Sequence, residues 1–235
     1  MDAGGGMTIK SAVVYRIFFL CFGFLVCSQS SAELTDYSCG SIKNAYGPYD
    51  YRSGGIGLKE VEGNHLTPEV VNLVRGKTGY IGGDLDYTLR AYPNHHVALM
   101  AMVRLGEKEK TSKPIGANYT VECYFKRALI FRSDDGVVRT IYASYLYKAG
   151  KKAEALNQLN EAVQLGEDSP NTNYNIGLIY FDLKEYEKAL SFAQRAYGSG
   201  FPLPGLRDKL KRVGKWEEPV SRIENRGTPV TNPGN

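Results

Sequence analysis

The stretch that decides the fold is residues 173–197, NYNIGLIYFDLKEYEKALSFAQRAY. Small residues and aromatic rings alternate in it at the spacing that two short antiparallel helices need in order to pack closely. Small residues also recur every 34 positions: Ala155 with Ala189, Ala162 with Ala196, Ala143 with Gly177, and Ala128 with Ala162. The sequence therefore predicts a repeated helix–turn–helix unit.

A 34-residue period is typical of the tetratricopeptide repeat (TPR), and residues 94–200 resemble TPR proteins. The resemblance implies an all-α fold, a TPR-like α-solenoid of about three repeats at 94–133, 134–168 and 169–200. The second and third repeats carry the pattern, whereas the first matches in its second helix. The sequence departs from the family at the early aromatic position, which is Arg139 or Asn173, and at the closing proline, which is Ser133 or Glu167.

Within the repeats the pattern predicts helices over 94–106, 118–131, 137–149 and 151–165, and a third pair between 169 and 198 with Asn171 as N-cap. Residues 107–117 have the composition of an exposed insertion. A short helix at 206–213 is expected within a capping segment, 201–216, because its basic residues provide the polar outer face that a solenoid end requires. Residues 217–235 have little to bury, and we expect a disordered tail.

Residues 33–93 are rich in tyrosine, glycine and turn formers, which predicts an irregular segment with two short helices. Thr67-Pro68-Glu69 marks the start of one helix, expected to run from Pro68 to Arg75. The second is expected from Leu85 to Ala91, with Asp84 as its cap. So much aromatic surface needs a host to bury it, so we expect this segment to pack on the helical body.

The N-terminus has the features of a secretory leader. Two cations, Lys10 and Arg16, precede an apolar run from Ile17 to Cys27, and small residues lead to a predicted cleavage after Ala32. The apolar run is too short for a comfortable membrane span, so no stable span is expected in the mature form. The alternatives are an uncleaved anchor and a lipoprotein attached through Cys27, whose preceding residues lack the usual small side chain. Residues 1–32 thus predict export to the periplasm of a Gram-negative bacterium.

Charge gives little indication of a partner. Removing residues 1–32 would lower the formal net charge from +4 to +3, because two cations and one acid leave with the leader. So small a charge does not favour a nucleic-acid partner.

Cys39 and Cys123 are the two cysteines that remain after such a cleavage. An even pair in an oxidising compartment favours a disulfide. Free core thiols and a metal or redox role are the alternatives, although neither cysteine lies in a CxxC motif.

In TPR proteins the first helices line a concave groove that binds an extended peptide or a partner helix. Carried over by position, the resemblance places the groove at eleven residues: His96, Met100, Arg104, Thr140, Ser144, Tyr147, Lys148, Tyr174, Leu178, Phe181 and Asp182. Rings supply contact area and cations orient a carboxylate. The other possibility is that residues 33–93 fill this groove.

Catalytic signals are weak. His65, His95 and His96, with Asp84 and Asp86 near in sequence, could bind a metal ion. Adjacent histidines on a helix point about 100° apart and rarely bind one ion. The sequence has no GxSxG motif, and Gly82-Gly83 lacks the Lys-Ser/Thr of a phosphate loop. We therefore expect no enzyme activity and no cofactor.

Three functions remain. The sequence favours a non-enzymatic adaptor that binds another envelope protein through the groove. The first alternative is a small envelope enzyme or metal-binding protein centred on the three histidines. The second is a structural subunit whose repeats pack on copies of themselves. The sequence leaves the oligomeric state open.

Overall fold

The computed structural model of the chain describes residues 39–166 and 168–218. The chain divides into two compact units, Met1–Glu33 and Leu34–Asn235, and all described residues belong to the second. The predicted leader lies outside the described residues, as does nearly all of the predicted tail. Across the described ranges the structure is helical, with no strand, and no helix there is long and apolar enough to cross a membrane.

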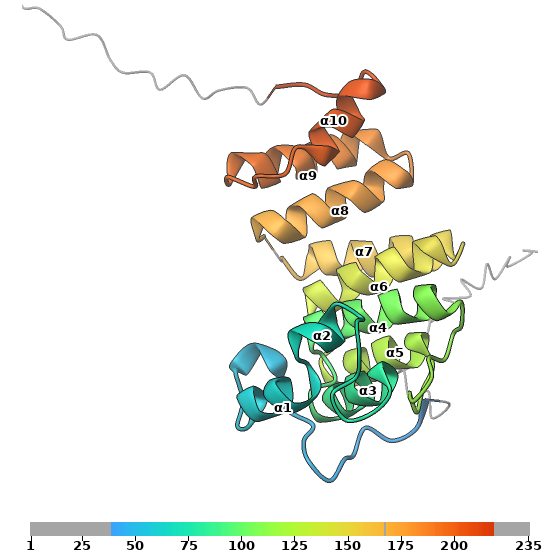
Figure 1. Ribbon diagram of the computed structural model, residues 1–235. Coiled ribbons are helices and arrows are strands. Elements are labelled where there is room, and N and C mark those ends of the chain that lie inside the picture. Colours follow the sequence, from blue (N-terminus) through green and yellow to red (C-terminus); the bar gives the residue numbers. More distant parts are fainter. Residues whose placement is uncertain (1–38, 167, 219–235) are drawn as a thin grey trace, which may run out of the picture. The chain divides into compact units, whose positions relative to one another are not determined.

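The repeats form successive helix pairs, in agreement with the predicted all-α fold (Figure 1). The first pair is α4 (His96–Glu109) and α5 (Val121–Phe131), the second α6 (Gly136–Lys148) and α7 (Lys152–Gln164), and the third α8 (Pro170–Asp182) and α9 (Tyr186–Gly198). A last helix, α10 (Gly205–Arg212), packs on α8 and α9. Each first helix also packs on the next one, so that α6 lies between α4 and α8.

The periodic small residues are buried where these helices pack. Ala128, Ala155, Ala162, Ala189 and Ala196 are all completely buried, as the 34-residue spacing predicts. Without a long side chain between them, the backbones of paired helices approach closely. Larger residues at these positions would overpack the interface.

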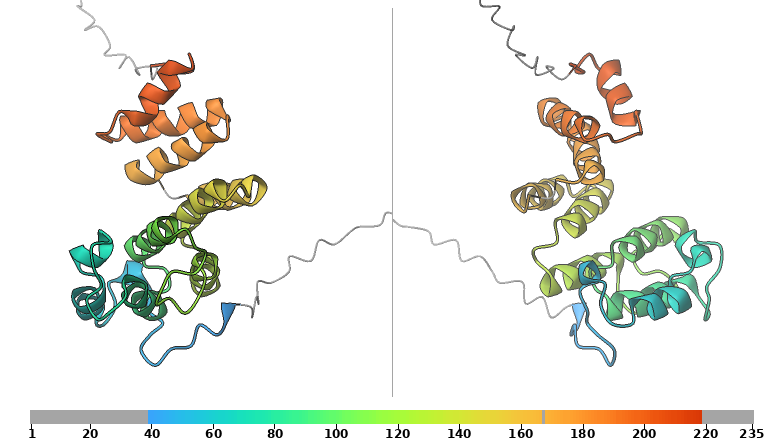
Figure 2. Two further views of the ribbon diagram at one scale, coloured as in Figure 1. Left: turned by 45° about the vertical axis from the view of Figure 1, so that its right-hand side comes forward. Right: turned by 90° about the vertical axis from the view of Figure 1, so that its left-hand side faces the viewer.

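The N-terminal segment contains more regular structure than its sequence predicts. A 3₁₀ turn, η2 (Tyr51–Ser53), is followed by α1 (Leu58–His65), α2 (Pro68–Val71) and α3 (Ile81–Ala91). No helical pattern had indicated α1. Helices α1 and α2 both pack on α3, and α2 and α3 pack on α4 (Figure 2).

Several expected helix boundaries were wrong. Helix α2 ends at Val71, four residues early, because Leu73 adopts a left-handed conformation with φ of 58°. Helix α3 begins at Ile81, so Asp84 lies inside the helix and does not cap it. Ser169, not Asn171, caps α8 by accepting a hydrogen bond from the Thr172 amide.

Helix α4 continues through Gly106, where the sequence predicted its end. A Cβ atom at Gly106 would lie 3.0 Å from both the Thr111 oxygen and Val121 Cγ2. The glycine therefore permits a close approach of the following loop and α5, and does not stop the helix. The insertion accordingly begins at Lys110, which is the C-cap of α4.

A disulfide between Cys39 and Cys123 fastens the start of the described segment to α5, in agreement with the predicted pairing. The fully buried Arg127, one turn further along α5, strengthens the attachment. Its Nη1 donates to the carbonyl oxygens of Cys39 (3.1 Å) and Ser41 (2.7 Å), and its guanidinium lies 4.2 Å from the Tyr119 ring centroid. Several acceptors and a ring together offset the cost of burying this cation.

Candidate binding surface

The eleven predicted groove residues lie on α4, α6 and α8, which are neighbours in the structure. Polar contacts between these helices run through three of the predicted residues. The Lys148 Nζ is 2.8 Å from a Glu107 carboxylate oxygen on α4, and the Tyr147 hydroxyl donates to the Asp182 carbonyl on α8 at 2.8 Å. Helix α6 is thus linked to both α4 and α8, and we call the side of these three helices that carries the predicted groove residues the inner face.

The N-terminal segment covers part of this face at α4. The Arg104 Nη2 donates to the Val71 carbonyl of α2 at 2.8 Å. The His96 Nε2 lies 3.0 Å from both Asp135 carboxylate oxygens, and the His96 ring meets the edge of Tyr51 at 5.1 Å between centroids. Two of the predicted groove residues are therefore engaged within the chain.

The predicted C-terminal cap also covers the opposite end of this face, and the sequence did not indicate that contact. The Lys209 Nζ from α10 lies 3.1 Å from an Asp182 carboxylate oxygen and 5.2 Å from the Phe181 ring centroid. The Tyr174 ring stacks on Phe201 at 4.2 Å between centroids. Three more predicted groove residues thus contact the cap.

Between the covered ends lies a set of residues that we call the central inner face: Met100, Ser144, Tyr147, Lys148 and Leu178. Met100 is 43% exposed, Lys148 is exposed, and the other three are half-buried. Thr140 does not join them, because it is buried and its hydroxyl donates to the Gly136 carbonyl within α6. The accessible part of the predicted groove is therefore smaller than the sequence suggested.

A cavity of about 430 Å³ opens elsewhere, where residues of α5 and α7 surround Arg139, Tyr142 and Leu146 of α6. The Arg139 guanidinium donates to the Gln158 amide oxygen (2.9 Å) and to the Ser133 carbonyl (2.8 Å), and pairs with Glu161. These contacts hold the cation that stands where the repeat usually has an aromatic residue. They also use the donor groups that a bound anion would need.

The three histidines do not converge. The His65 Nδ1 lies 3.0 Å from Asp84, the His95 Nε2 lies 3.1 Å from Glu62, and His96 contacts Asp135. Each imidazole thus has its own carboxylate from a different element. In the part of the chain that the structure describes, no group of three histidine, cysteine or acidic side chains is arranged to hold a metal ion.

Asp86, the other acid of the predicted metal cluster, has separate partners. It pairs with Arg90 at 2.8 Å, accepts the Tyr124 hydroxyl at 2.5 Å and accepts the Asn118 amide at 2.8 Å. These bonds join α3 to the α4–α5 loop and to α5.

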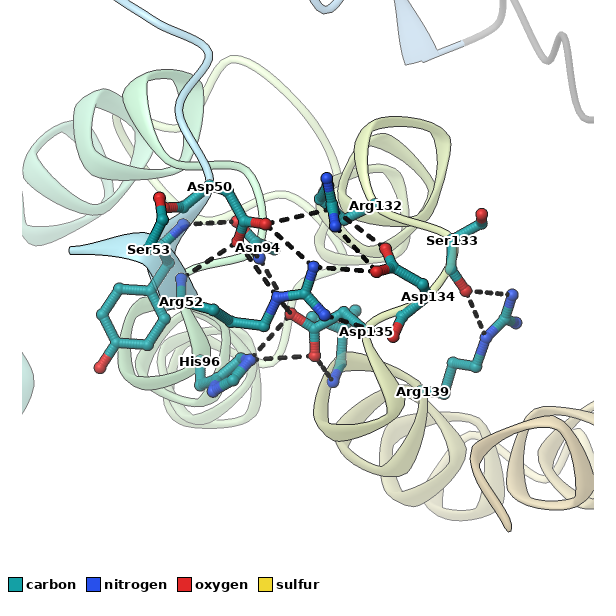
Figure 3. A network of polar contacts seen from close by, with 12 residues as sticks. Asp50, Arg52, Ser53, Asn94, His96, Arg132, Ser133, Asp134, Asp135 and Arg139 are labelled. Carbon is teal, nitrogen blue, oxygen red and sulfur yellow. Dashed lines mark hydrogen bonds and ion pairs between the residues drawn. The ribbon is translucent and has the colours of Figure 1, made fainter. Parts of the chain in front are cut away.

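A polar network joins η2 to the starts of α4 and α6 (Figure 3). The buried Asn94 is at its centre: its Nδ2 donates to Asp50 at 2.7 Å and to Asp135 at 2.9 Å, and its Oδ1 accepts the Tyr51 amide. Asp135 also caps α6 by accepting the Val138 amide at 3.0 Å. The network therefore fixes the N-terminal segment and the first helices of two repeats at one point.

A ring of charges surrounds this centre. Arg52 pairs with Asp50 (2.9 Å) and Asp134 (3.1 Å), and Arg132 contacts the same two acids. The hydrogen bond and charge of Arg52 hold the pKa of Asp50 well below its usual range. Burial alone would raise the pKa of Asp135, but hydrogen bonds from neighbours including His96 outweigh burial and lower it.

His95 is expected to make the fold sensitive to mild acid. Burial lowers the pKa of His95 to about 4 from an ordinary 6.5, although its hydrogen bond to Glu62 opposes the shift. Because the pKa of His95 is lower in the folded protein than in the unfolded chain, the contribution of neutral His95 to the free energy of unfolding is complete above pH 6.5. It is lost as the pH falls from 6.5 towards 4, and amounts to about 3 kcal/mol.

Urea unfolding at several pH values in this window tests the expectation. His95 also caps α4 through Nδ1, which accepts the Ala98 amide at 3.4 Å. The matched variant is therefore His95→Asn, since asparagine retains capping ability and does not titrate. An unchanged pH dependence in His95→Asn would show that another group is responsible.

Residues 122–196 match the family described as anaphase-promoting complex, cyclosome, subunit 3. The matched segment, about a third of the chain, runs from α5 into α9. No curated protein and no solved structure gives a significant match. Together with the packed helix pairs, the match identifies this segment as TPR-like repeats, a class of structure that commonly serves as a scaffold for protein–protein interaction.

Proposed function

We propose that this chain is a non-catalytic scaffold of the bacterial cell envelope that binds a partner protein on its central inner face. The ligand would be an extended peptide or a helix from an envelope protein. The observation that carries the proposal is the exposed Met100 on α4 together with half-buried Tyr147 and Leu178 on α6 and α8, since α6 packs on both α4 and α8 in these TPR-like repeats. Apolar and aromatic side chains of this kind supply most of the energy of peptide binding.

The two covered ends support a short ligand. Contacts of α2 with Arg104 and of Lys209 with Asp182 limit the accessible face to its middle. A ligand there would cross α4, α6 and α8 and would not follow the whole length of the repeats. Lys148, although paired with Glu107, is exposed at the edge and could orient a carboxylate of the ligand.

Photocrosslinking in intact cells tests the binding face. A photoreactive amino acid at position 100 or 144 should give the same adduct, and Met100→Glu should reduce the adduct formed from position 144 by about tenfold. Position 165 is the matched control, because Leu165 is 42% exposed at the end of α7, outside this face. The same adduct from position 165, or none from 100 and 144, would contradict the proposal.

Export is proposed from the leader alone and needs its own test. The mature chain is expected to begin after Ala32 and to be released with the periplasmic fraction. The mass of the purified protein gives its N-terminus. An unprocessed chain in the cytoplasmic fraction would contradict envelope localisation while leaving the binding face untouched.

A further inference from the structure

Two loops beside α3 share an unusual combination of exposed apolar and basic side chains. The first, residues 72–80, exposes Val74 (71%) and Tyr80 (68%), and the second, residues 110–118, exposes Ile115 (59%). Large apolar side chains that are exposed together in one patch commonly mark an interaction site. We call these two segments the basic loops.

The basic loops lie against each other. A Cβ atom at Gly116 would be 2.8 Å from Tyr80 Cβ, and one at Gly82 would meet the Ile115 carbonyl. The backbone around Ile115 and Gly116 is thus in close contact with the residues that begin α3. Tyr80 and Ile115 therefore belong to a single surface patch.

Two buried carboxylates of α3 hold the loops from below. Asp84 accepts the Lys77 amide (2.6 Å), the Thr78 amide (3.1 Å) and the Thr78 hydroxyl (2.5 Å). Asp86 accepts the Asn118 amide side chain at 2.8 Å. Asp84 and Asp86, which resemble a metal-binding DxD motif in sequence, therefore each fix one of the two loops.

The loops are also fixed at their edges. The Lys108 Nζ of α4 donates to the Leu73 carbonyl at 2.8 Å, and the Ile115 amide donates to the Glu109 carboxylate at 2.8 Å. With the backbone held in this way, the loops that carry Val74, Tyr80 and Ile115 do not have to be ordered when they bind a partner. Preorganisation of this kind lowers the entropic cost of association.

The charge of the loops has a single sign. Four cations, Arg75, Lys77, Lys110 and Lys113, are exposed, and neither loop sequence contains an aspartate or glutamate. In the described part of the chain the three lysines form no ion pair, while Arg75 makes a 4.0 Å contact with Glu69 of α2. The flanking Glu109 is engaged by the loop backbone. The patch therefore complements an anionic surface.

We propose that the basic loops dock the protein on the surface of a bilayer that contains anionic lipids. Lysine and arginine would lie at the phosphate level, Val74 and Ile115 would enter the acyl boundary, and Tyr80 would remain at the interface, where its ring and hydroxyl are both satisfied. A bilayer needs only sign and apolar area, which the loops supply. An acidic protein would require a matching shape, and neither the cavity around Arg139 nor the pocket between Tyr46 and Tyr87 is lined by these loops.

Vesicle co-sedimentation with the purified full-length chain tests the proposal. Binding should be stronger to vesicles containing phosphatidylglycerol than to pure phosphatidylcholine. The variant Lys77→Gln/Lys113→Gln should lose about 25-fold in affinity, at about fivefold for each cation. The control Lys152→Gln/Lys211→Gln removes two exposed lysines elsewhere and should change binding less than about twofold.

A second matched pair of variants tests what the apolar side chains contribute to vesicle binding. Ile115→Asn should weaken binding by roughly tenfold, whereas Leu203→Asn, at a side chain that is 57% exposed, should have no effect. Tyr80→Trp should be quenched by brominated lipid more strongly than the single native tryptophan, Trp216. The loop and control variants share the same leader, so binding by the leader cancels when these variants are compared with one another.

Three results would overturn the proposal: no preference for anionic vesicles, equal losses in the loop and control variants, or adducts from the loops to a protein in the absence of lipid. Met100→Glu should leave vesicle binding unchanged. Failure of the proposed peptide site and failure of the membrane site can therefore be distinguished.

Discussion

Loss of the Cys39–Cys123 disulfide is expected to lower the free energy of unfolding by about 4–5 kcal/mol in the chain-entropy model. The bond joins residues 84 positions apart, so it removes many conformations from the unfolded chain. Urea unfolding of the oxidised protein and of Cys39→Ser/Cys123→Ser measures the difference. The contact of Arg127 with the same segment does not depend on the disulfide, so the variant should still fold.

The comparison has an internal control. Dithiothreitol should lower the urea midpoint of the parent and leave that of the double variant unchanged. The effect should be strongest in the core that α2 and α3 share with α4 and α5, and weaker in the second core, which α8, α9 and α10 form with residues of α6 and α7. Equal midpoints for the oxidised parent and the double variant would show that the unfolded chain gains little freedom when the bond is lost.

The repeats could be predicted because their information is local and periodic. A buried alanine every 34 residues, such as Ala155 and Ala189, reports the face of a helix regardless of what else the chain does. The cysteine pair could be predicted equally well, since only two cysteines follow the leader. Both predictions needed only spacing and count.

Polar contacts between residues that lie far apart in the sequence left no periodic pattern of this kind. Asp84 has the sequence features of a helix cap, yet it lies inside α3 and holds a loop that ends the preceding helix early. Arg127 sits in an ordinary amphipathic helix, and nothing local indicates that it binds carbonyls 86 to 88 residues away. The same limit applies to the binding surface, because Lys209 and Phe201 cover predicted groove residues from outside the repeat pattern.

Asp135→Ala is expected to destabilise the protein by about 3–5 kcal/mol. The carboxylate is completely buried, caps α6 and accepts hydrogen bonds from Asn94 and Val138 while it contacts His96. Its removal leaves the Asn94 amide and the His96 imidazole without their buried partner, which costs far more than the loss of an exposed ion pair. Chemical unfolding at pH 7 measures the effect.

Asp134 provides a control one residue away. Its side chain is 52% exposed and pairs with Arg52 and Arg132, so Asp134→Ala should cost no more than about 1 kcal/mol. Asp135→Asn should fall between the two, since asparagine still caps a helix but lacks the charge. Similar losses in Asp134→Ala and Asp135→Ala would mean that the outer ring of charges, rather than the buried centre, fixes the N-terminal segment to the repeats.

Because the pKa of Asp135 is lowered in the fold, its contribution to the free energy of unfolding should persist down to about pH 4 and fall away below it.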